Sequence, residues 1–305
     1  MLAGWGSARP VTLDNQPGAE TAPNIVIITV QYKNVADTAS FVACLGLIEG
    51  IAGCELIIVD NDSTGADSAE LQKICDNAPC ALRLIRPRHN LYYWGGAAVA
   101  IEALSGSGLP PPHWVIVCNN DVDIEDPWFL RRLRLLDPSS YPIVAPTIIS
   151  EATGKDQNPF LIEPAGPLKR LKWRIYDVDY RVATAMLATH RVLKHATMGV
   201  AARFSPFRRA RQGEAAQRKI YAPHGSFVIF SKAFFDSGAV LDTTVPMFAE
   251  ELTLAAVAHD LKLGVWHVPD LKVSHREHST TGVELTEPKY ELERMARKHY
   301  FSLTV

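Results

Sequence analysis

Short β-branched apolar runs alternate with helical patterns through the first half of this chain, and this alternation limits its fold more than any other feature. The runs typical of buried strands are IVIITV (25–30), ELIIVD (55–60), LRLI (82–85), WVIVC (114–118) and Ile143–Ala145. Helical patterns lie between them, at 38–49, 67–76, 95–104 and 127–136. Strand-helix alternation predicts an α/β fold with a largely parallel sheet and right-handed crossovers.

Polar side chains follow four of these predicted strands, at the point where each strand ends. They are Gln31-Tyr32, Asp60-Asn61, His89-Asn90 and the run Asn119–Asp123. In open α/β sheets, ligands bind beyond the carboxyl ends of the strands. The sequence therefore predicts a binding site at this edge of the sheet.

The pattern changes after residue 150. Residues 151–220 lack strand signals and are predicted to form a basic, mostly helical insertion. Strands return at Ser226–Phe230, Val265–Val268 and Leu271–Ser274, with a helix at 250–262. We expect four parts: a flexible lead (1–23), a first α/β half (24–150), the insertion (151–220) and a second half of the same domain (221–305).

Charge is unevenly distributed along the chain. The formal net charge is −2, yet residues 168–219 hold thirteen Lys and Arg against three Asp and Glu. This segment is either a solvated cover for the sheet or a surface for anionic lipid phosphates at the inner membrane face. Nucleic acid is not an expected partner, because no recognition motif accompanies the charge.

Targeting signals and cysteine usage favour a cytoplasmic protein. Residues 1–23 lack the charged start and apolar core of a signal peptide, and no apolar stretch is long enough to span a bilayer. The five cysteines form no CxxC pair, so neither a disulfide framework nor a zinc site is expected. We expect a cytoplasmic chain, with peripheral membrane association as the alternative for its basic segment.

The run Asn119-Asn120-Asp121-Val122-Asp123 contains candidate metal ligands. Mg²⁺ and Mn²⁺ prefer oxygen ligands, and Mg²⁺ commonly takes one or two carboxylates plus substrate phosphates. An acidic turn before the Pro127 helix is the alternative. Asp60 is similarly open to two interpretations: it either caps a turn or accepts hydrogen bonds from a base or ribose.

Two further pairs of titratable residues lie in the second half. Glu250 and Glu251 begin a helix, where they either complement the helix dipole or supply a general base. His275 and His278 follow a late strand and are either surface residues or metal ligands. Established phosphate loops are missing: Trp94-Gly95-Gly96-Ala97 is not GxGxxG, and there is no GxxxxGK[ST]. The two glycines still permit close backbone approach to a ligand.

Seven segments, in order from about Asn24 to Ser279, resemble glycosyltransferase family 2, particularly bacterial rhamnosyl- and galactofuranosyltransferase-like members. They are IVIITVQYKN, LIIVDNDSTG, RHNLYYWGGAAVAIEAL, WVIVCNNDV, HGSFVIFSKAFF, FAEELTLAAVA and VPDLKVSHREHST. The resemblance implies a GT-A fold and inverting sugar transfer. It also implies a nucleotide-sugar donor (UDP-, dTDP- or GDP-linked), Mg²⁺ or Mn²⁺, and a glycan or lipid-linked acceptor.

The resemblance also assigns roles to residues. Those assigned to the nucleotide sugar are Val30, Tyr32, Asp60 (base), Asn61, Asn90, Gly95, Gly96 and Asn120. Asp121 would hold the metal, with His275 near the metal-diphosphate and Asp123 a weaker candidate. Glu251 would be the catalytic base, with Glu250 the second choice.

Two positions depart from the family pattern. Ala98 stands where the glycine loop usually carries Asn, and Glu251 replaces the commoner Asp. Two alternatives to sugar transfer stay open: a nucleotidyltransferase-like enzyme, which shares a nucleotide-binding parallel sheet and a metal, and, given the Glu-for-Asp change, a catalytically inactive protein that binds a sugar nucleotide. The segment Gln31–Asn34 argues against the former, because it lacks a Gly-rich phosphate loop with Arg or Lys.

Overall fold

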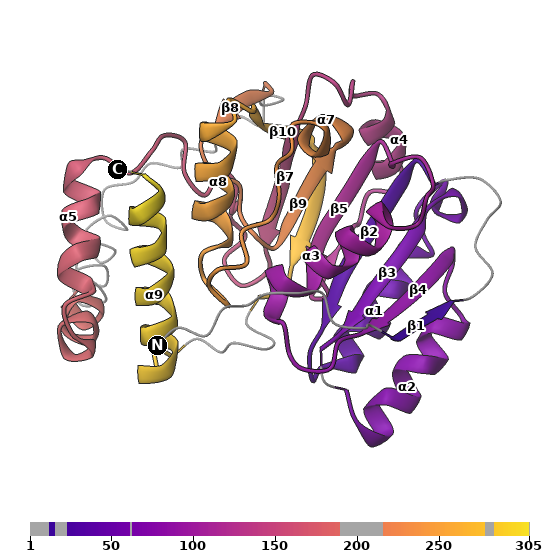
Figure 1. The fold of residues 1–305 in the computed structure, drawn as a ribbon, viewed down its shortest axis with the longest axis horizontal. Coiled ribbons are helices and arrows are strands. Elements are labelled where there is room, and N and C mark those ends of the chain that lie inside the picture. The colour runs from indigo at the N-terminus through magenta and orange to yellow at the C-terminus, as the bar shows by residue number, and fades with distance from the viewer. Residues whose placement is uncertain (1–11, 16–22, 62, 190–215, 278–283, 305) are drawn as a thin grey trace, which may run out of the picture.

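A computed structural model describes residues 12–15, 23–61, 63–189, 216–277 and 284–304 (Figure 1). Their strands form one ten-stranded sheet in the order β1-β4-β3-β2-β5-β9-β7-β10-β6, with β8 paired to β10. The strands are β1 (Thr12–Asn15), β2 (Ile25–Gln31), β3 (Glu55–Asp60), β4 (Ala81–Arg86), β5 (Trp114–Asn119), β6 (Val122–Asp123), β7 (Ile143–Ser150), β8 (Arg218–Ile220), β9 (Phe227–Ser231) and β10 (Val265–His275).

Helices cover both faces of the sheet. They are α1 (Val35–Leu45), α2 (Gly65–Asp76), α3 (Tyr92–Ser105), α4 (Phe129–Arg134), α5 (Pro167–Tyr176), α7 (Lys232–Asp236), α8 (Glu250–Asp260) and α9 (Glu287–Leu303), with a 3₁₀ turn at Ile51–Gly53. Residues 180–189 are also helical. Helices α1, α2 and α4 pack on one face through side chains such as Phe41, Leu71 and Phe129. Helices α3, α7 and α8 pack on the other.

The centre of the sheet follows directly from its apolar sequence. Every residue of β2 is buried, and so is every residue of β3 after Glu55. Strands covered by helices on both faces need continuous apolar runs, which is why these segments do not alternate with polar residues. The predicted α/β class and the five strands of the first half are therefore confirmed.

The sheet is mixed because its second half enters between strands of the first. Strand β9 runs antiparallel to both β5 and β7, while β2, β3, β4 and β5 are mutually parallel. The two strands expected at 265–268 and 271–274 are one strand, β10, with a register shift between Val268 and Lys272. Pro269 lies at this shift, where its missing N–H interrupts the ladder.

Two expected segments differ from the structure. Within the expected lead, Thr12–Asn15 forms an edge strand antiparallel to β4, and the rest of that segment lies outside the described residues. Among the described residues of the insertion, α5 and residues 180–189 are helical, and β8 adds a strand. Residues 151–166 are irregular, with isolated bridges to Ile149 and Ala222, in a stretch containing Pro159 and Pro164.

The C-terminal helix adds a further layer outside α8. Its Tyr300 is fully buried in a cluster with Leu252 and Ala255 of α8, against which Trp173 of α5 packs. Figure 1 shows α8, α9 and α5 following one another away from the sheet. No helix in the described part of the chain is long and apolar enough to cross a membrane.

Candidate active site

The carboxyl ends of β2, β3 and β5 meet at one edge of the sheet, as expected. Gln31 pairs with Asp60, and Val30 pairs with Asn119, so the three strands end at the same level. A pocket of about 520 Å³ opens at this edge. Its lining includes residues from both halves of the chain: Val30, Tyr32, Asn61, Asn90, Tyr92, Tyr93, Asn119, Asn120, Asp121, Gln157, His224, Gly225, Ser226, Met247, Phe248, Glu250, Glu251, His275 and Glu277.

Asn61 fastens the loop before α3 to the end of β3. Its amide nitrogen donates to the carbonyl of Tyr92 at 2.9 Å, and its amide oxygen accepts from the N–H of Leu91 at 3.2 Å. Asn90 accepts from the Tyr92 N–H at 2.7 Å. Tyr92 has a φ of 59°, which is uncommon for a residue with a side chain, and these hydrogen bonds stabilise it. The network therefore places Asn90 and Tyr92 against the pocket.

Three of the residues predicted to bind the nucleotide sugar do not line the pocket. Asp60 is buried, accepts from the Ser63 N–H at 3.0 Å and pairs with Arg86 at 3.4 Å. A Cβ on Gly96 would lie 3.1 Å from both γ-carbons of Val30, so this glycine lets α3 pack closely on β2. Gly95 lies in the same first turns of α3. The remaining five, Val30, Tyr32, Asn61, Asn90 and Asn120, do line it.

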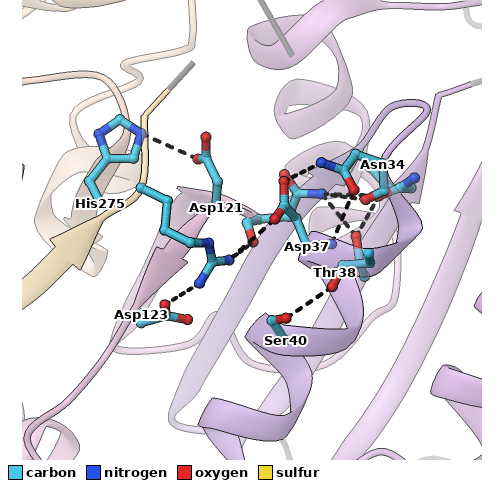
Figure 2. A network of polar contacts seen from close by, with 11 residues as sticks. Asn34, Asp37, Thr38, Ser40, Asp121, Asp123 and His275 are labelled. Atoms are coloured by element: carbon cyan, nitrogen blue, oxygen red, sulfur yellow. Dashed lines mark hydrogen bonds and ion pairs between the residues drawn. The ribbon is translucent and has the colours of Figure 1, made fainter. Parts of the chain in front are cut away.

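Asp121 and His275 face each other across the pocket edge (Figure 2). His275 Nε2 lies 3.2 Å from Asp121 Oδ1, and both side chains are buried. The pair exists because β6 is antiparallel to the end of β10, with Val122 opposite His275. The short strand β6 and the end of the long strand β10, which are far apart in the sequence, thus bring the expected carboxylate and imidazole together.

Gln157 determines which nitrogen of His275 faces Asp121. The Gln157 amide nitrogen donates to Glu277 at 2.8 Å, so its amide oxygen must be the atom 2.9 Å from His275 Nδ1. Nδ1 therefore donates to Gln157. This leaves Nε2 facing the Asp121 carboxylate, 3.2 Å from Oδ1.

A carboxylate oxygen and an imidazole nitrogen this close together can bind one cation. Ligands at adjacent corners of an octahedral Mg²⁺, each at about 2.1 Å, are separated by about 3 Å. The 3.2 Å between Asp121 and His275 fits this spacing. No cluster of three or more His, Cys, Asp or Glu able to hold a metal occurs among the described residues. Asp121 and His275 would therefore supply two of the ligands of such an ion. Diphosphate and water complete such sites, so the donor set fits a divalent ion bound with its substrate.

Asp123, the other acid of the run, points away from this pair. Its carboxylate forms an ion pair with the guanidinium of Arg276, and it does not line the pocket (Figure 2). Arg276 also approaches Asp37 of α1 at 3.7 Å and donates to the main-chain oxygen of Asn120 at 3.3 Å. The Asn120 amide donates to the Thr38 hydroxyl at 2.9 Å. Asp123 and Asn120 thus hold the 119–123 run against α1 and β10.

The two acids at the start of α8 line the same pocket but have different surroundings. Glu251 Oε1 accepts from the Gly225 N–H at 3.1 Å. A Cβ on Gly225 would lie 3.0 Å from that oxygen, so a larger residue there would press on the Glu251 carboxylate. Burial and the adjacent Glu251 raise the pKa of Glu250 to about 8. Glu250 therefore stays largely protonated at neutral pH.

Several pocket residues were not predicted from the sequence. His224 is the main one: Nδ1 lies 3.0 Å from the Ser226 hydroxyl, and its ring lies 5.9 Å from that of His275. Burial lowers the pKa of His224 and favours the neutral ring. Gln157, Tyr93 and Glu277 were also missed. His224 begins the segment HGSFVIFSKAFF, which is one of the seven that resemble the family, so the sequence could have placed it near the site. No sequence pattern pointed to Gln157, because it lies in an irregular stretch of the insertion. His278 lies outside the described residues.

No protein-family model matches this sequence, and no curated protein sequence matches it either. Solved structures do. One is a mannosyltransferase, PcManGT from Pyrobaculum calidifontis, in complex with GDP-Man and Mn²⁺: identity is 11%, coverage is 95% of this chain and 73% of that one, and the TM-score is 0.51. Another is S. aureus TarS 1–349 in complex with UDP-GlcNAc, with 12% identity, 92% and 70% coverage, and a TM-score of 0.54.

A third similar structure is GalNAc-T7 with UDP, GalNAc and Mn²⁺, at 10% identity and a TM-score of 0.55. The match covers 92% of this chain and about half (48%) of that one. These similarities show the fold: the chain has the GT-A-like architecture of glycosyltransferases, which confirms the expected fold class.

Proposed function

We propose that this chain is a metal-dependent glycosyltransferase that moves a sugar from a nucleoside-diphosphate sugar to a hydroxyl group of a glycan or lipid-linked acceptor. The observation that carries the proposal is that the Asp121–His275 pair and the Glu250–Glu251 pair line one pocket of a GT-A-like fold. One pair suits a metal-diphosphate and the other suits an acceptor hydroxyl. The structural neighbours solved with GDP-Man, UDP-GlcNAc, or UDP and GalNAc support a nucleotide-sugar donor.

The proposed reaction is a single displacement with inversion at the anomeric carbon. Glu251 accepts the proton of the acceptor hydroxyl, whose oxygen forms the new bond to the anomeric carbon. The bond from that carbon to the diphosphate oxygen breaks, and the electron pair leaves with the nucleoside diphosphate. Asp121 and His275 would hold a divalent ion, Mg²⁺ or Mn²⁺, which would neutralise the charge that develops on the departing diphosphate.

The surroundings of the two acids support Glu251 as the base. The Gly225 N–H orients the Glu251 carboxylate, while Glu250, with its pKa raised to about 8, holds its proton at neutral pH. A protonated Glu250 avoids a second negative charge beside the base and can donate a hydrogen bond to a sugar or to Glu251. The proposed assignment gives the adjacent acids different roles because their environments differ.

Replacing each key acid tests this function. Glu251→Gln should reduce transfer at least ~10²-fold while preserving affinity for the donor, because a general base acts in the chemical step. Asp121→Ala should weaken donor binding in the presence of Mn²⁺ but change it little in EDTA. Donor affinity is measured calorimetrically with UDP-, GDP- and dTDP-sugars, and transfer by release of the nucleoside diphosphate.

Two results would overturn the proposal. If the wild-type chain binds a sugar nucleotide but neither hydrolyses nor transfers it with either metal, it is a binding protein. If it releases diphosphate from a nucleoside triphosphate and a sugar phosphate, it is a nucleotidyltransferase. Unchanged turnover in Glu251→Gln, with transfer intact in the wild type, would remove only the assignment of the base.

A further inference from the structure

Helix α5 exposes a strip of aliphatic side chains on the outside of the molecule. Leu168, Leu171, Ile175 and Val178 are 84%, 54%, 45% and 66% exposed. They are three or four residues apart, so the three within α5 share one face of the helix, and Val178 continues this spacing just beyond its end. No residue of α5 is buried. A contiguous apolar strip of this kind marks an interaction surface more often than an isolated exposed leucine does.

The opposite face of α5 already has its partner, helix α9. The ring of Trp173 packs against those of Tyr300 and Phe301, at 6.3 and 6.2 Å between centroids. Arg170 donates to the carbonyl of Thr304 at 2.9 Å. Just after α5, Asp177 forms an ion pair with Arg297 of α9 at 2.7 Å. These contacts turn the aliphatic strip away from the body of the protein, and Figure 1 shows α5 as the outermost helix at its end of the molecule.

Basic side chains border the strip. Lys172 and Arg174 lie on either side of it on the helical wheel, and both are exposed. The Arg174 guanidinium also lies 5.7 Å from the centre of the Phe301 ring of α9. The Lys169 ammonium lies over the Trp173 ring instead of beside the strip. Pro167–Tyr176 contains two lysines, two arginines and no acid. An aliphatic face bordered by cations is the pattern of a helix that lies in a membrane interface, where the apolar face enters the headgroup boundary and the cations meet lipid phosphates.

We propose that the aliphatic strip and its basic border dock α5 on an anionic phospholipid surface. Charge favours this occupant over a second copy of the chain, because a twofold contact between two such strips would bring identical basic borders together. An acidic lipid surface instead attracts each lysine and arginine. The sequence left a lipid-binding surface in residues 168–219 as one of two interpretations, and this proposal assigns it to one face of α5. The inference does not depend on sugar transfer, since binding to lipid requires neither donor nor metal.

Vesicle co-sedimentation of the full chain tests this inference. Wild-type protein is mixed with vesicles of phosphatidylcholine alone and of phosphatidylcholine with phosphatidylglycerol. We expect binding to the mixed vesicles, weakened by added salt because the charges are screened. Leu171→Glu combined with Ile175→Glu should lower the partition coefficient at least ~10-fold, because it places two acids in the apolar strip. Lys172→Gln with Arg174→Gln should lower binding to mixed vesicles but not to pure phosphatidylcholine.

Leu47→Glu combined with Leu135→Glu is the matched control, because these leucines are 77% and 81% exposed and are carried outside α5. This control should bind vesicles as the wild type does. Thermal unfolding verifies that each variant is folded. The inference is overturned if the wild type fails to bind mixed vesicles, if it binds both vesicle types equally, or if the α5 variant binds as well as the control. A change in oligomeric mass with α5 substitution and no vesicle binding would instead assign the strip to a second copy.

Discussion

Glu250 and Glu251 are adjacent in the sequence, yet the fold treats them differently. The Gly225 N–H donates a hydrogen bond to the side chain of Glu251. Burial and the neighbouring Glu251 carboxylate favour the neutral form of Glu250. This difference has a thermodynamic consequence. The pKa of Glu250 rises from 4.5 to about 8 on folding, so between these pH values the folded protein retains a proton that the unfolded chain has released. The free energy of unfolding must therefore fall as pH rises through this window.

Glu250→Gln should remove that dependence. Relative to the wild type, we expect the variant to gain stability progressively from pH 5 to pH 8, by up to about 1 kcal/mol per pH unit. Urea denaturation at several pH values measures this. Glu287→Gln is the control, because Glu287 also lies in the first turn of a helix but is exposed. Parallel stability curves for wild type and Glu250→Gln would contradict the assignment.

Gln157 orients the His275 ring through one hydrogen bond. By accepting from His275 Nδ1 it leaves Nε2 facing Asp121. Partners that orient a metal-binding histidine typically change metal affinity by about 10–100-fold when removed. Gln157→Leu should therefore weaken Mn²⁺-supported donor binding by about 10-fold, measured by calorimetry with and without EDTA. Gln72→Leu, at an exposed position on α2, should leave it unchanged; equal loss in both variants would refute the role.

The difference between predicted and unpredicted site residues lies in how each reaches the pocket. Asn61, Asp121 and Glu251 stand at the ends of strands or the start of a helix, so a pattern of elements was enough to place them. Gln157 reaches the pocket from an irregular stretch. Asp60 occupied its predicted position, but the Arg86 ion pair and the turn hydrogen bond that engage it are tertiary and local details that spacing does not reveal.

Among the elements, those with a continuous apolar run or a clear helical period were predicted, whereas β6 and α9 were not. Strand β3 has the predicted bounds, Glu55–Asp60, because its apolar run is continuous. Strand β6 is two residues long and exists only because the end of β10 lies beside it. Helix α9 buries only Tyr290, Ala296 and Tyr300 of seventeen residues, so its apolar signal is weak. Propensity cannot identify elements whose stability comes from packing.

Arg276 connects three of these elements. It lies one residue beyond β10, pairs with Asp123 of β6 and approaches Asp37 of α1. Arg276→Met would leave both acids without this cation beside the site. We expect the free energy of unfolding to fall by about 1–3 kcal/mol, because two partly buried acids lose a charged partner.

The loss should extend to function, because the Asn119–Asp123 run would no longer be held against α1. We expect donor affinity in Mn²⁺ to fall about 10-fold, as for other residues that orient metal ligands. Arg132→Met on α4 is the control, because it removes a surface ion pair with Asp126, which precedes that helix. It should lower the free energy of unfolding by less than about 1 kcal/mol and leave donor binding intact. A purely structural Arg276 would lower stability without any change in donor affinity.

At the scale of the whole molecule, the two halves of the sequence share one sheet. Strands β9 and β10 of the second half alternate with β5 and β7 of the first. The pocket is shared in the same way, since Tyr93 of α3 donates from its hydroxyl to the Gly225 carbonyl at 3.0 Å. The expected division at residue 150 therefore separates stretches of sequence but not independent folding units.

This arrangement predicts cooperative unfolding of both halves. Ile229 is fully buried on β9, opposite Ile116 of β5 and Val144 of β7. Ile229→Ala should lower the free energy of unfolding by about 2–5 kcal/mol. Strand β9 lies between strands of the first half, and Trp94 and Trp114 of that half contribute to the tryptophan fluorescence. The midpoint of urea unfolding should therefore fall by the same amount in tryptophan fluorescence and in far-ultraviolet circular dichroism. Separate transitions for the two signals, with only one displaced by the substitution, would show that the halves fold independently.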